Sequence, residues 1–226
     1  MRSAEPDASH HLTSQVIVRV YEPRDQAALR QIACETADRG EPIGRVFPDH
    51  ELIADLLTRY YTDYDPTAVW VAEEGGRLIG YLTGCLDSHR YWRTMRWRVI
   101  PRALIRAIGH GTAWSGRTWG FVQRGLLNWW RAACRRHISL AEYPAHLHVN
   151  LRAGFRGQRV GERLLQRFCD QACAARVRGI HVVVRKDNAM AQRLFERAGF
   201  TPLICNVSSH HEVSADQDTM IYAKRL

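Results

Sequence analysis

Several features that would place this chain of 226 residues in a common class are missing. No apolar run reaches the roughly 18 to 20 residues that span a bilayer, and residues 1–15 lack a basic start followed by an apolar stretch. The six cysteines form no C-x-x-C pair, which argues against both a zinc site and a disulfide framework. Cys169 and Cys173, one helical turn apart, are expected to be small buried thiols. The absences predict a reduced, cytoplasmic setting and no structural metal.

Two common phosphate-binding motifs are missing as well. The chain has no G-x-G-x-x-G, and no Lys-Ser or Lys-Thr follows its glycine-rich turns, so neither a dinucleotide nor a nucleoside triphosphate is expected first. What is present is a glycine-bearing turn at 156–161, between an alternating strand at 146–151 and an amphipathic helix at 160–175. Such a turn aims free backbone N–H groups and the positive end of a helix dipole at one point. We therefore expect an anionic cofactor with a pyrophosphate there.

Acidic residues are missing from the stretch 88–141, which contains eleven of the thirty arginines and six of the seven tryptophans. At helical spacing, the apolar residues fall on one face and the arginines on another. This pattern predicts a helical insertion of two or three short amphipathic helices, broken at Pro101 and 109–116. Four explanations stay open: a roof over a binding site that selects an acidic or phosphorylated acceptor, a surface for an anionic membrane, a surface for nucleic acid, and an ordinary solvated helix face.

The other segments alternate between strand and helix patterns. After a leader expected to be disordered at 1–14, strands are predicted at 16–21, 68–73, 77–85, 146–151, 180–185, 202–207 and 219–224, and helices at 24–37, 50–61, 160–175 and 188–198. Gly75 and Gly76 predict a tight hairpin. Paired strands followed by strand–helix repeats predict one α/β (mixed α+β) domain over 15–226, with a central, mostly antiparallel sheet of about seven strands and helices on both faces.

Two phrases of the sequence resemble the signatures of the GNAT (GCN5-related N-acetyltransferase) superfamily. The turn at 156–161 is similar to that family's acyl-CoA pyrophosphate loop, with Arg159 where the family usually has its first glycine. Downstream, DNAMAQRLFERAGF at 187–200 is similar to the family's second signature, Asn-x-x-Ala-x-x-Leu-Tyr-x-x-x-Gly-Phe. A third phrase, at 143–151, is similar to a subgroup that includes the acetyltransferase-like domain of O-GlcNAcase.

The resemblance implies a GNAT-like fold and an N-acetyltransferase that transfers the acetyl group of acetyl-CoA to an amine by direct attack. It also implies that the strands at 146–151 and 180–185 splay apart and admit the pantetheine arm. The residues implied to bind the cofactor are Val149 and Leu151 through their backbone, Arg156, Gly157, Gln158, Arg159, Val160 and Gly161 in the turn, and Asn188 and Phe195 in the second signature. We expect Arg159 to take a right-handed helical conformation, and Asn188 also to cap a helix.

The catalytic residues are less directly marked. Phe195 stands where the family has its tyrosine general acid, and phenylalanine has no proton to give. His146, His148 and Asn150 share one face of their strand. His148 is the candidate general base, because imidazole titrates near neutral pH; a hydrogen-bonded structural histidine is an equal alternative. Asn150 is a candidate for orienting the acceptor, and Tyr143 for the acid.

Other functions also stay open for this sequence. An inactive acyl-CoA-binding module is motivated by Arg159 and Phe195, and a membrane- or nucleic-acid-associated protein by the basic insertion at 88–141. The sequence does not identify the acceptor, which is expected to be a small-molecule or peptide amine.

Overall fold

The structure is a computed structural model that describes residues 15–36, 50–109, 138–203 and 219–226. The predicted leader at 1–14, the second half of the insertion at 110–137 and the end of the strand predicted at 202–207 lie outside the described residues.

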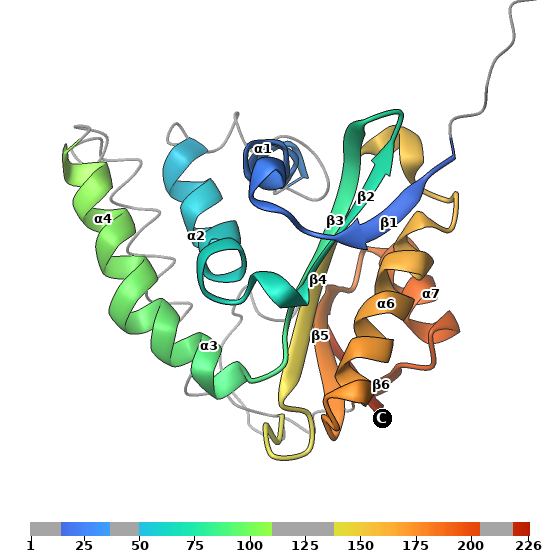
Figure 1. Ribbon diagram of the computed structural model, residues 1–226. Helices are drawn as coiled ribbons and strands as arrows, with labels where there is room; N and C mark the ends of the chain where they lie inside the picture. Colours follow the sequence, from blue (N-terminus) through green and yellow to red (C-terminus); the bar gives the residue numbers. More distant parts are fainter. Residues whose placement is uncertain (1–14, 37–49, 110–137, 204–218) are drawn as a thin grey trace, which may run out of the picture.

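A seven-stranded sheet runs through the described residues. In spatial order its strands are β1 (Ile17–Val20), β2 (Val69–Glu74), β3 (Arg77–Cys85), β4 (Ala145–Leu151), β5 (Gly179–Arg185), β7 (Thr219–Arg225) and β6 (Thr201–Leu203) (Figure 1). Only β4 and β5 pair in parallel, and the other neighbouring pairs are antiparallel. The predicted mixed, mostly antiparallel sheet is confirmed. Gly75 and Gly76 have φ of 54° and 78°, the left-handed backbone that a two-residue hairpin needs.

Helices cover both faces of the sheet, as predicted. One face carries α1 (Gln26–Thr36), α2 (His50–Tyr64), α3 (Ser88–Thr94) and α4 (Ile100–Gly109), and the other carries α6 (Val160–Ala174) and α7 (Ala189–Arg197) (Figure 1). The chief difference from the predicted bounds is in α2, which continues past Tyr61 to Tyr64.

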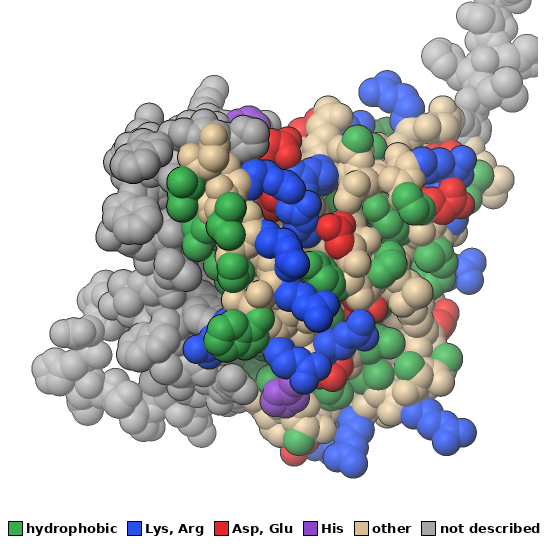
Figure 2. All heavy atoms as spheres, turned by 60° about the vertical axis from the view of Figure 1, so that its left-hand side comes forward, with side chains coloured by type: hydrophobic (Ala, Val, Ile, Leu, Met, Phe, Trp, Pro, Cys, Tyr) green, Lys and Arg blue, Asp and Glu red, His purple; other side chains and the backbone are tan. Residues whose placement is uncertain are grey.

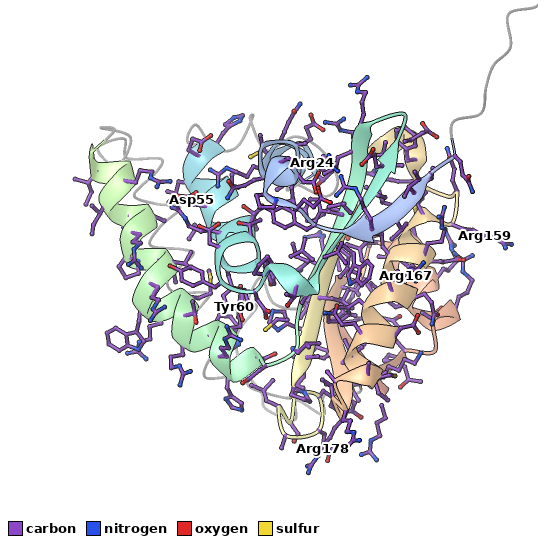
Figure 3. The ribbon with its side chains drawn as sticks, in the orientation of Figure 1. Arg24, Asp55, Tyr60, Arg159, Arg167 and Arg178 are labelled. Carbon is purple, nitrogen blue, oxygen red and sulfur yellow. The ribbon has the colours of Figure 1, made fainter. Side chains whose placement is uncertain are left out.

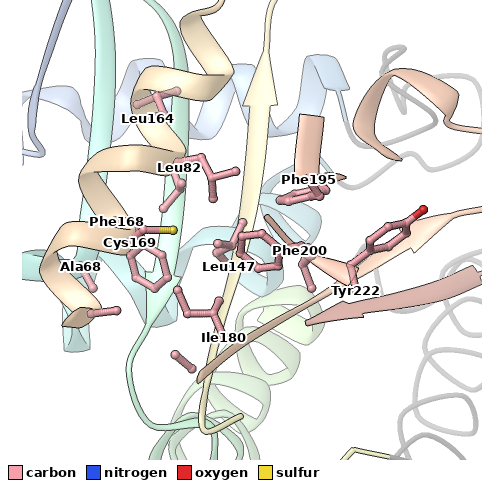
Figure 4. Packing of buried hydrophobic residues seen from close by; sticks show 14 of the residues in the cluster. Ala68, Leu82, Leu147, Leu164, Phe168, Cys169, Ile180, Phe195, Phe200 and Tyr222 are labelled. Carbon is pink, nitrogen blue, oxygen red and sulfur yellow. The ribbon is translucent and has the colours of Figure 1, made fainter. Parts of the chain in front are cut away.

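The larger apolar core lies between the sheet and α6. Leu164 and Phe168 of α6 are fully buried and belong to one cluster with Leu82 of β3 and Leu147 of β4 (Figure 4). Gly84 makes room for the Phe168 ring, because a Cβ at that position would lie 2.1 Å from it. A second cluster lies under α1 and α2. β4 therefore has packed helices on both of its faces.

The expectation of two buried thiols in α6 is wrong for one of them. Cys169 is buried in the main cluster, whereas Cys173 is exposed. The buried stripe of the helix ends at Ala172, and successive residues of a helix are about 100° apart. Cys173 is thereby turned away from the core.

Residues 88–109 of the insertion form one continuous helix, so the prediction that Pro101 breaks it is wrong. α3 leads into a π-helical turn, Met95–Val99, and the turn leads into α4. In a regular α-helix the ring of Pro101 would clash with the carbonyl group four residues earlier. In the π turn the Ile100 N–H donates to the Met95 carbonyl, and this wider turn accommodates the proline.

Candidate active site

β4 and β5 are paired only where they begin. Ala145 lies opposite Ile180, and His146 lies opposite His181. Beyond these positions the two strands have no paired residues, although β4 continues to Leu151 and β5 to Arg185. The predicted splay of these two strands is confirmed, and it opens toward their carboxyl ends.

The hydrogen bonds of β4 show which backbone groups face the gap. Just after the strand, the Arg152 N–H donates to the Ile79 carbonyl at 3.0 Å, so Arg152 faces the β3 side. Backbone groups point to alternate sides along an antiparallel strand. The N–H and C=O groups of Val149 and Leu151 therefore face the gap, where β5 offers no paired residue.

The start of α6 lies at the open end of this gap. Arg159, the residue before the helix, makes no side-chain cap, and the Arg163 N–H donates to the Arg159 carbonyl at 3.1 Å. The N–H groups of Val160 and Gly161 precede this first helical bond and have no acceptor within the helix. A Cβ added to Gly161 would lie 3.6 Å from Leu151, which places the helix start beside the end of β4. The arrangement suits a bound pyrophosphate.

Arg159 is left-handed, with φ 59° and ψ 10°, so the prediction of a right-handed conformation is wrong. A non-glycine residue in this conformation costs about 1–2 kcal/mol. The side chain is exposed and projects outward beside α6 (Figure 3). Gly157, two residues earlier, is also left-handed at φ 81°. The turn thus keeps a glycine-like backbone where the sequence has arginine.

Two side chains tie the turn to neighbouring backbone. Arg156 Nε donates to the Leu151 carbonyl at 3.2 Å, and Gln158 Nε2 donates to the Gly154 carbonyl at 2.9 Å. The role predicted for Arg156 and Arg159 as phosphate ligands stays a prediction.

The second signature forms α7 and the residues around it. Asn188 Oδ1 accepts the Ala191 N–H at 3.0 Å, so Asn188 caps α7 as expected. Phe195 is buried, and its ring packs edge-on against Phe200 with centroids 5.4 Å apart. The cofactor contacts predicted for Asn188 and Phe195 stay predictions.

His146 is held through both ring nitrogens. Nδ1 lies 2.7 Å from Ser88 Oγ, and Nε2 lies 3.1 Å from the Tyr61 hydroxyl. Ser88 Oγ donates its own proton to the Pro144 carbonyl at 2.7 Å, so it accepts from Nδ1–H, and Nε2 accepts from Tyr61. Burial, with smaller effects from the neighbouring histidines, lowers the pKa of His146 well below its ordinary value. His146 is a neutral, hydrogen-bonded structural histidine.

His148 differs from His146 although both side chains lie on one face of β4. It is exposed, and none of the described residues forms a hydrogen bond with its ring. The ring centroids of Tyr61 and His146 lie 6.2 and 6.1 Å away. Partial desolvation by the surrounding protein is the larger cause and nearby His181 the smaller one, and together they lower the pKa of His148 to about 4. The ring is therefore neutral at physiological pH; its role as a base stays a prediction.

The residues that surround these two histidines carry no mark in the sequence. They are Tyr61 of α2, Ser88 and Tyr91 of α3, and His181 of β5. The His181 Nδ1–H donates to the Tyr143 carbonyl at 2.9 Å, and burial lowers the pKa of this histidine. These residues come from distant segments and share no local motif, so only the pairing of β4 with β5 would have placed His181 opposite His146.

The other two predicted catalytic residues have partners away from His148. Asn150 Nδ2 donates to the buried Tyr81 hydroxyl at 2.8 Å. Tyr143 precedes β4, at the closed end of the splay, where its carbonyl accepts from His181 and its ring lies beside Gly179 of β5. Their roles in orienting the acceptor and donating a proton stay predictions.

Residues 34–200 match the family model described as the acetyltransferase (GNAT) family. The chain belongs to this family. The match covers most of the chain and includes the turn before α6, α7 and the splayed strands. GNAT proteins are N-acetyltransferases that use acetyl-CoA as the acetyl donor, and the open backbone of β4 with the uncapped start of α6 fits such a cofactor.

Solved structures show the same fold. The protein named SsHAT is 22% identical, with a TM-score of 0.73 over 93% of this chain and 98% of its own. The Drosophila melanogaster polyamine N-acetyltransferase, which forms N-acetylagmatine, is 18% identical, with a TM-score of 0.57 over 94% of this chain and 100% of its own. The Salmonella typhimurium putative acetyltransferase yncA, solved with acetyl-CoA, is 15% identical, with a TM-score of 0.50 over 93% of each chain.

Two further findings concern the described residues of this GNAT chain. No three His, Cys, Asp or Glu side chains among them gather in a way that would hold a metal ion, and the predicted absence of a metal stays a prediction. In the same residues no helix combines the length and the apolar character needed to cross a membrane.

Proposed function

We propose that the protein transfers the acetyl group of acetyl-CoA directly to an amine, with His148 as the general base. One observation carries the proposal. Where β4 parts from β5, an exposed imidazole without a hydrogen-bonding partner among the described residues directly precedes Val149, whose backbone faces the gap.

The cofactor would lie along the gap from its open end. The N–H groups of Val160 and Gly161, with the positive end of α6, would bind the pyrophosphate. The pantetheine amides would pair with the backbone of Val149 and Leu151, as an added strand pairs with a sheet edge. The thioester would then lie where the gap begins, just past the paired His146 and His181, with His148 beside it.

The chemistry needs one group that takes and returns a proton. The amine nitrogen attacks the thioester carbonyl carbon, and His148 accepts a proton from the nitrogen as the C–N bond forms. The nitrogen of the tetrahedral adduct is more acidic than a free ammonium ion, so a weakly basic imidazole suffices. The C–S bond then breaks, and the proton passes from His148 to the departing thiolate. These reaction steps require no tyrosine at position 195, where this chain has Phe195.

The main rival is an inactive acyl-CoA-binding module. Part of its motivation is Arg159, but the left-handed backbone of that residue keeps the turn in a glycine-like shape. Phe195 is the remaining motivation. The exposed imidazole of His148, which forms no hydrogen bond with a described residue, favours catalysis. Binding of acyl-CoA alone does not require such a group where β4 and β5 part.

We propose a small amine as the acceptor. The structural neighbours include enzymes named for agmatine and polyamines. Among the described residues, Arg98, Arg102 and Arg106 contact α2 at Tyr64 and Asp55 rather than the face of β4. These contacts lend no support to an arginine roof that selects an acidic acceptor.

The test is release of free CoA thiol from acetyl-CoA across a panel of amines, including agmatine, spermidine, an amino sugar and a peptide N-terminus. His148→Ala should lower kcat/KM by about 100-fold or more, the usual contribution of a general base, while calorimetry shows unchanged acetyl-CoA affinity. The control is His50→Ala, at the exposed start of α2, which should change neither. Undiminished turnover in His148→Ala would contradict the assignment, and binding without turnover for every amine would favour the inactive module.

A further inference from the structure

The helices of the insertion present a face that is rich in arginine. Its members, all exposed, are Arg90, Arg93, Arg96, Arg98 and Arg102. None of them forms an ion pair with a carboxylate of the described residues. The neighbouring Arg106 behaves differently, since it joins Arg30 and Arg59 around the buried carboxylate of Asp55 at 2.7–2.9 Å. Arg106 is therefore paired with a buried carboxylate, whereas the five arginines of this face form no ion pair with a described carboxylate, although Asp65 attracts Arg90.

An open groove of about 360 Å³ runs along this arginine face, lined by Tyr64, Arg90, Arg93, Thr94, Trp97 and Arg98. Tyr64 organises it: its carbonyl accepts Arg90 Nη2 at 3.2 Å, its hydroxyl accepts Arg102 Nη1 at 3.4 Å, and the Arg98 guanidinium lies 5.9 Å above its ring. A guanidinium has five N–H donors, and these contacts use few of them. The remaining donors are available to phosphate oxygens.

Large apolar side chains are exposed on the same continuous helix. The exposed fractions are 69% for Trp97, 69% for Ile105 and 56% for Ile108. Figure 2 shows apolar side chains beside a band of basic side chains on this face of the protein. The Arg96 guanidinium lies 5.2 Å from the centre of the Trp97 ring. The helix therefore presents apolar and cationic groups to solvent together.

We propose that this face docks on an anionic phospholipid surface. Trp97, Ile105 and Ile108 enter the boundary between headgroups and acyl chains, where tryptophan is favoured, and the arginines of this face bind lipid phosphates. Charge complementarity and exposed aliphatic side chains together favour lipid. Single-stranded nucleic acid would bind the arginines and stack on Trp97 but would leave both isoleucines without a partner.

The test is cosedimentation of the full chain with phosphatidylcholine vesicles that contain or lack phosphatidylserine. Binding should require phosphatidylserine and weaken steeply with salt. Each arginine near a charged bilayer contributes about fivefold in affinity, so R93E/R98E should lower it by about 25-fold or more. I105S/I108S should also weaken binding by several-fold, without changing acetyl transfer in solution. Equal binding at low salt to vesicles with and without phosphatidylserine would overturn the proposal. A complete lack of vesicle binding at low salt would also overturn it.

The matched control reverses two exposed arginines outside the insertion. Arg167 on α6 and Arg178 before β5 lie away from α4 (Figure 3), and R167E/R178E should bind vesicles within about threefold of the wild type, since the proposed contact excludes them. Equal losses of vesicle affinity in R93E/R98E and R167E/R178E would mean that net charge alone attracts the protein. That result would contradict docking through the arginine face. If oligonucleotides bind tightly and I105S/I108S leaves both ligands unaffected, the partner is nucleic acid and the lipid proposal is wrong.

Discussion

The two ends of β4 show how one strand serves two purposes. At its beginning, Ala145, His146 and Leu147 are buried, β3 pairs on one side, and β5 pairs with Ala145 and His146 on the other. At its end, His148–Leu151 pairs with β3 alone, and its side chains are exposed or partly buried. The first part is the sealed end and the second is the open end. The alternation of side chains is the same in both, so pairing and burial make the difference.

The contrast between the two histidines follows from these surroundings. His146 at the sealed end has both nitrogens occupied, so it contributes to stability and cannot exchange protons with a substrate. His148 at the open end has a free ring and directly precedes backbone that faces the gap. A sequence motif cannot separate the two, because they occupy equivalent positions on one strand face.

The largest expected difference between the ends is in stability. His146→Ala should lower the free energy of unfolding by about 3 kcal/mol, because it leaves a cavity and removes the partners of Tyr61 and Ser88. His148→Ala should change it by less than about 0.5 kcal/mol, as expected for an exposed side chain. Urea unfolding of both variants measures the difference. Similar losses in the two variants would remove the distinction between the sealed and open ends.

Acid should act mainly through the sealed end. The folded pKa of His146 lies below its unfolded value of about 6.5. Below pH 6.5 the unfolded chain therefore binds a proton at His146, whereas the native state does not. The free energy of unfolding falls as the pH falls from 6.5. Each pH unit in this range costs about 1.4 kcal/mol for this histidine. The lowered pKa of His148 acts in the same direction, but its effect is smaller because water partly solvates the exposed ring.

The matched variant for the acid effect is His146→Gln, which keeps polar atoms near Tyr61 and Ser88 but does not titrate. Its unfolding free energy, measured between pH 7 and 5, should depend less on pH than that of the wild type. An unchanged pH dependence would mean that groups other than His146 cause the acid sensitivity.

The smallest expected effect concerns the turn beside the open end. Arg159→Gly removes the strain of a left-handed residue but increases the freedom of the unfolded chain. The two changes nearly cancel, so stability should rise by less than about 1 kcal/mol. Arg159→Val, which is β-branched, should instead lose about 1–2 kcal/mol. Thermal unfolding of the pair checks this prediction, and greater stability of the valine variant would argue against the left-handed conformation.

The sequence predicted most of the fold because its periodicities are strong. The strand at 146–151 alternates apolar and polar residues, and the helix at 160–175 has a regular apolar stripe, so both elements and their buried faces were predicted. The prediction failed at Pro101, where a π turn accommodates the ring within a continuous helix. Propensity alone does not show that an interrupted helix continues with another hydrogen-bond spacing.

The candidate site was only partly predictable. The turn and the second signature are local in sequence, and the splay of β4 from β5 followed from the family resemblance. The conformation of Arg159 was predicted wrongly, because a right-handed backbone is expected within the helix, whereas Arg159 is the N-cap that precedes Val160. Tyr61, Ser88 and His181 come from α2, α3 and β5 and meet only in the folded chain, so no spacing in the sequence marks them.

Amide hydrogen exchange along β4, with and without acetyl-CoA, tests the central claim most directly. The Val149 and Leu151 amides face the gap and should become slower on binding, as they pair with the pantetheine arm. The His148 and Asn150 amides, on the β3 side of the strand, are the internal control and should change little. Slowing confined to Val149 and Leu151 would support the account. Unchanged exchange at both amides under saturating acetyl-CoA would contradict it.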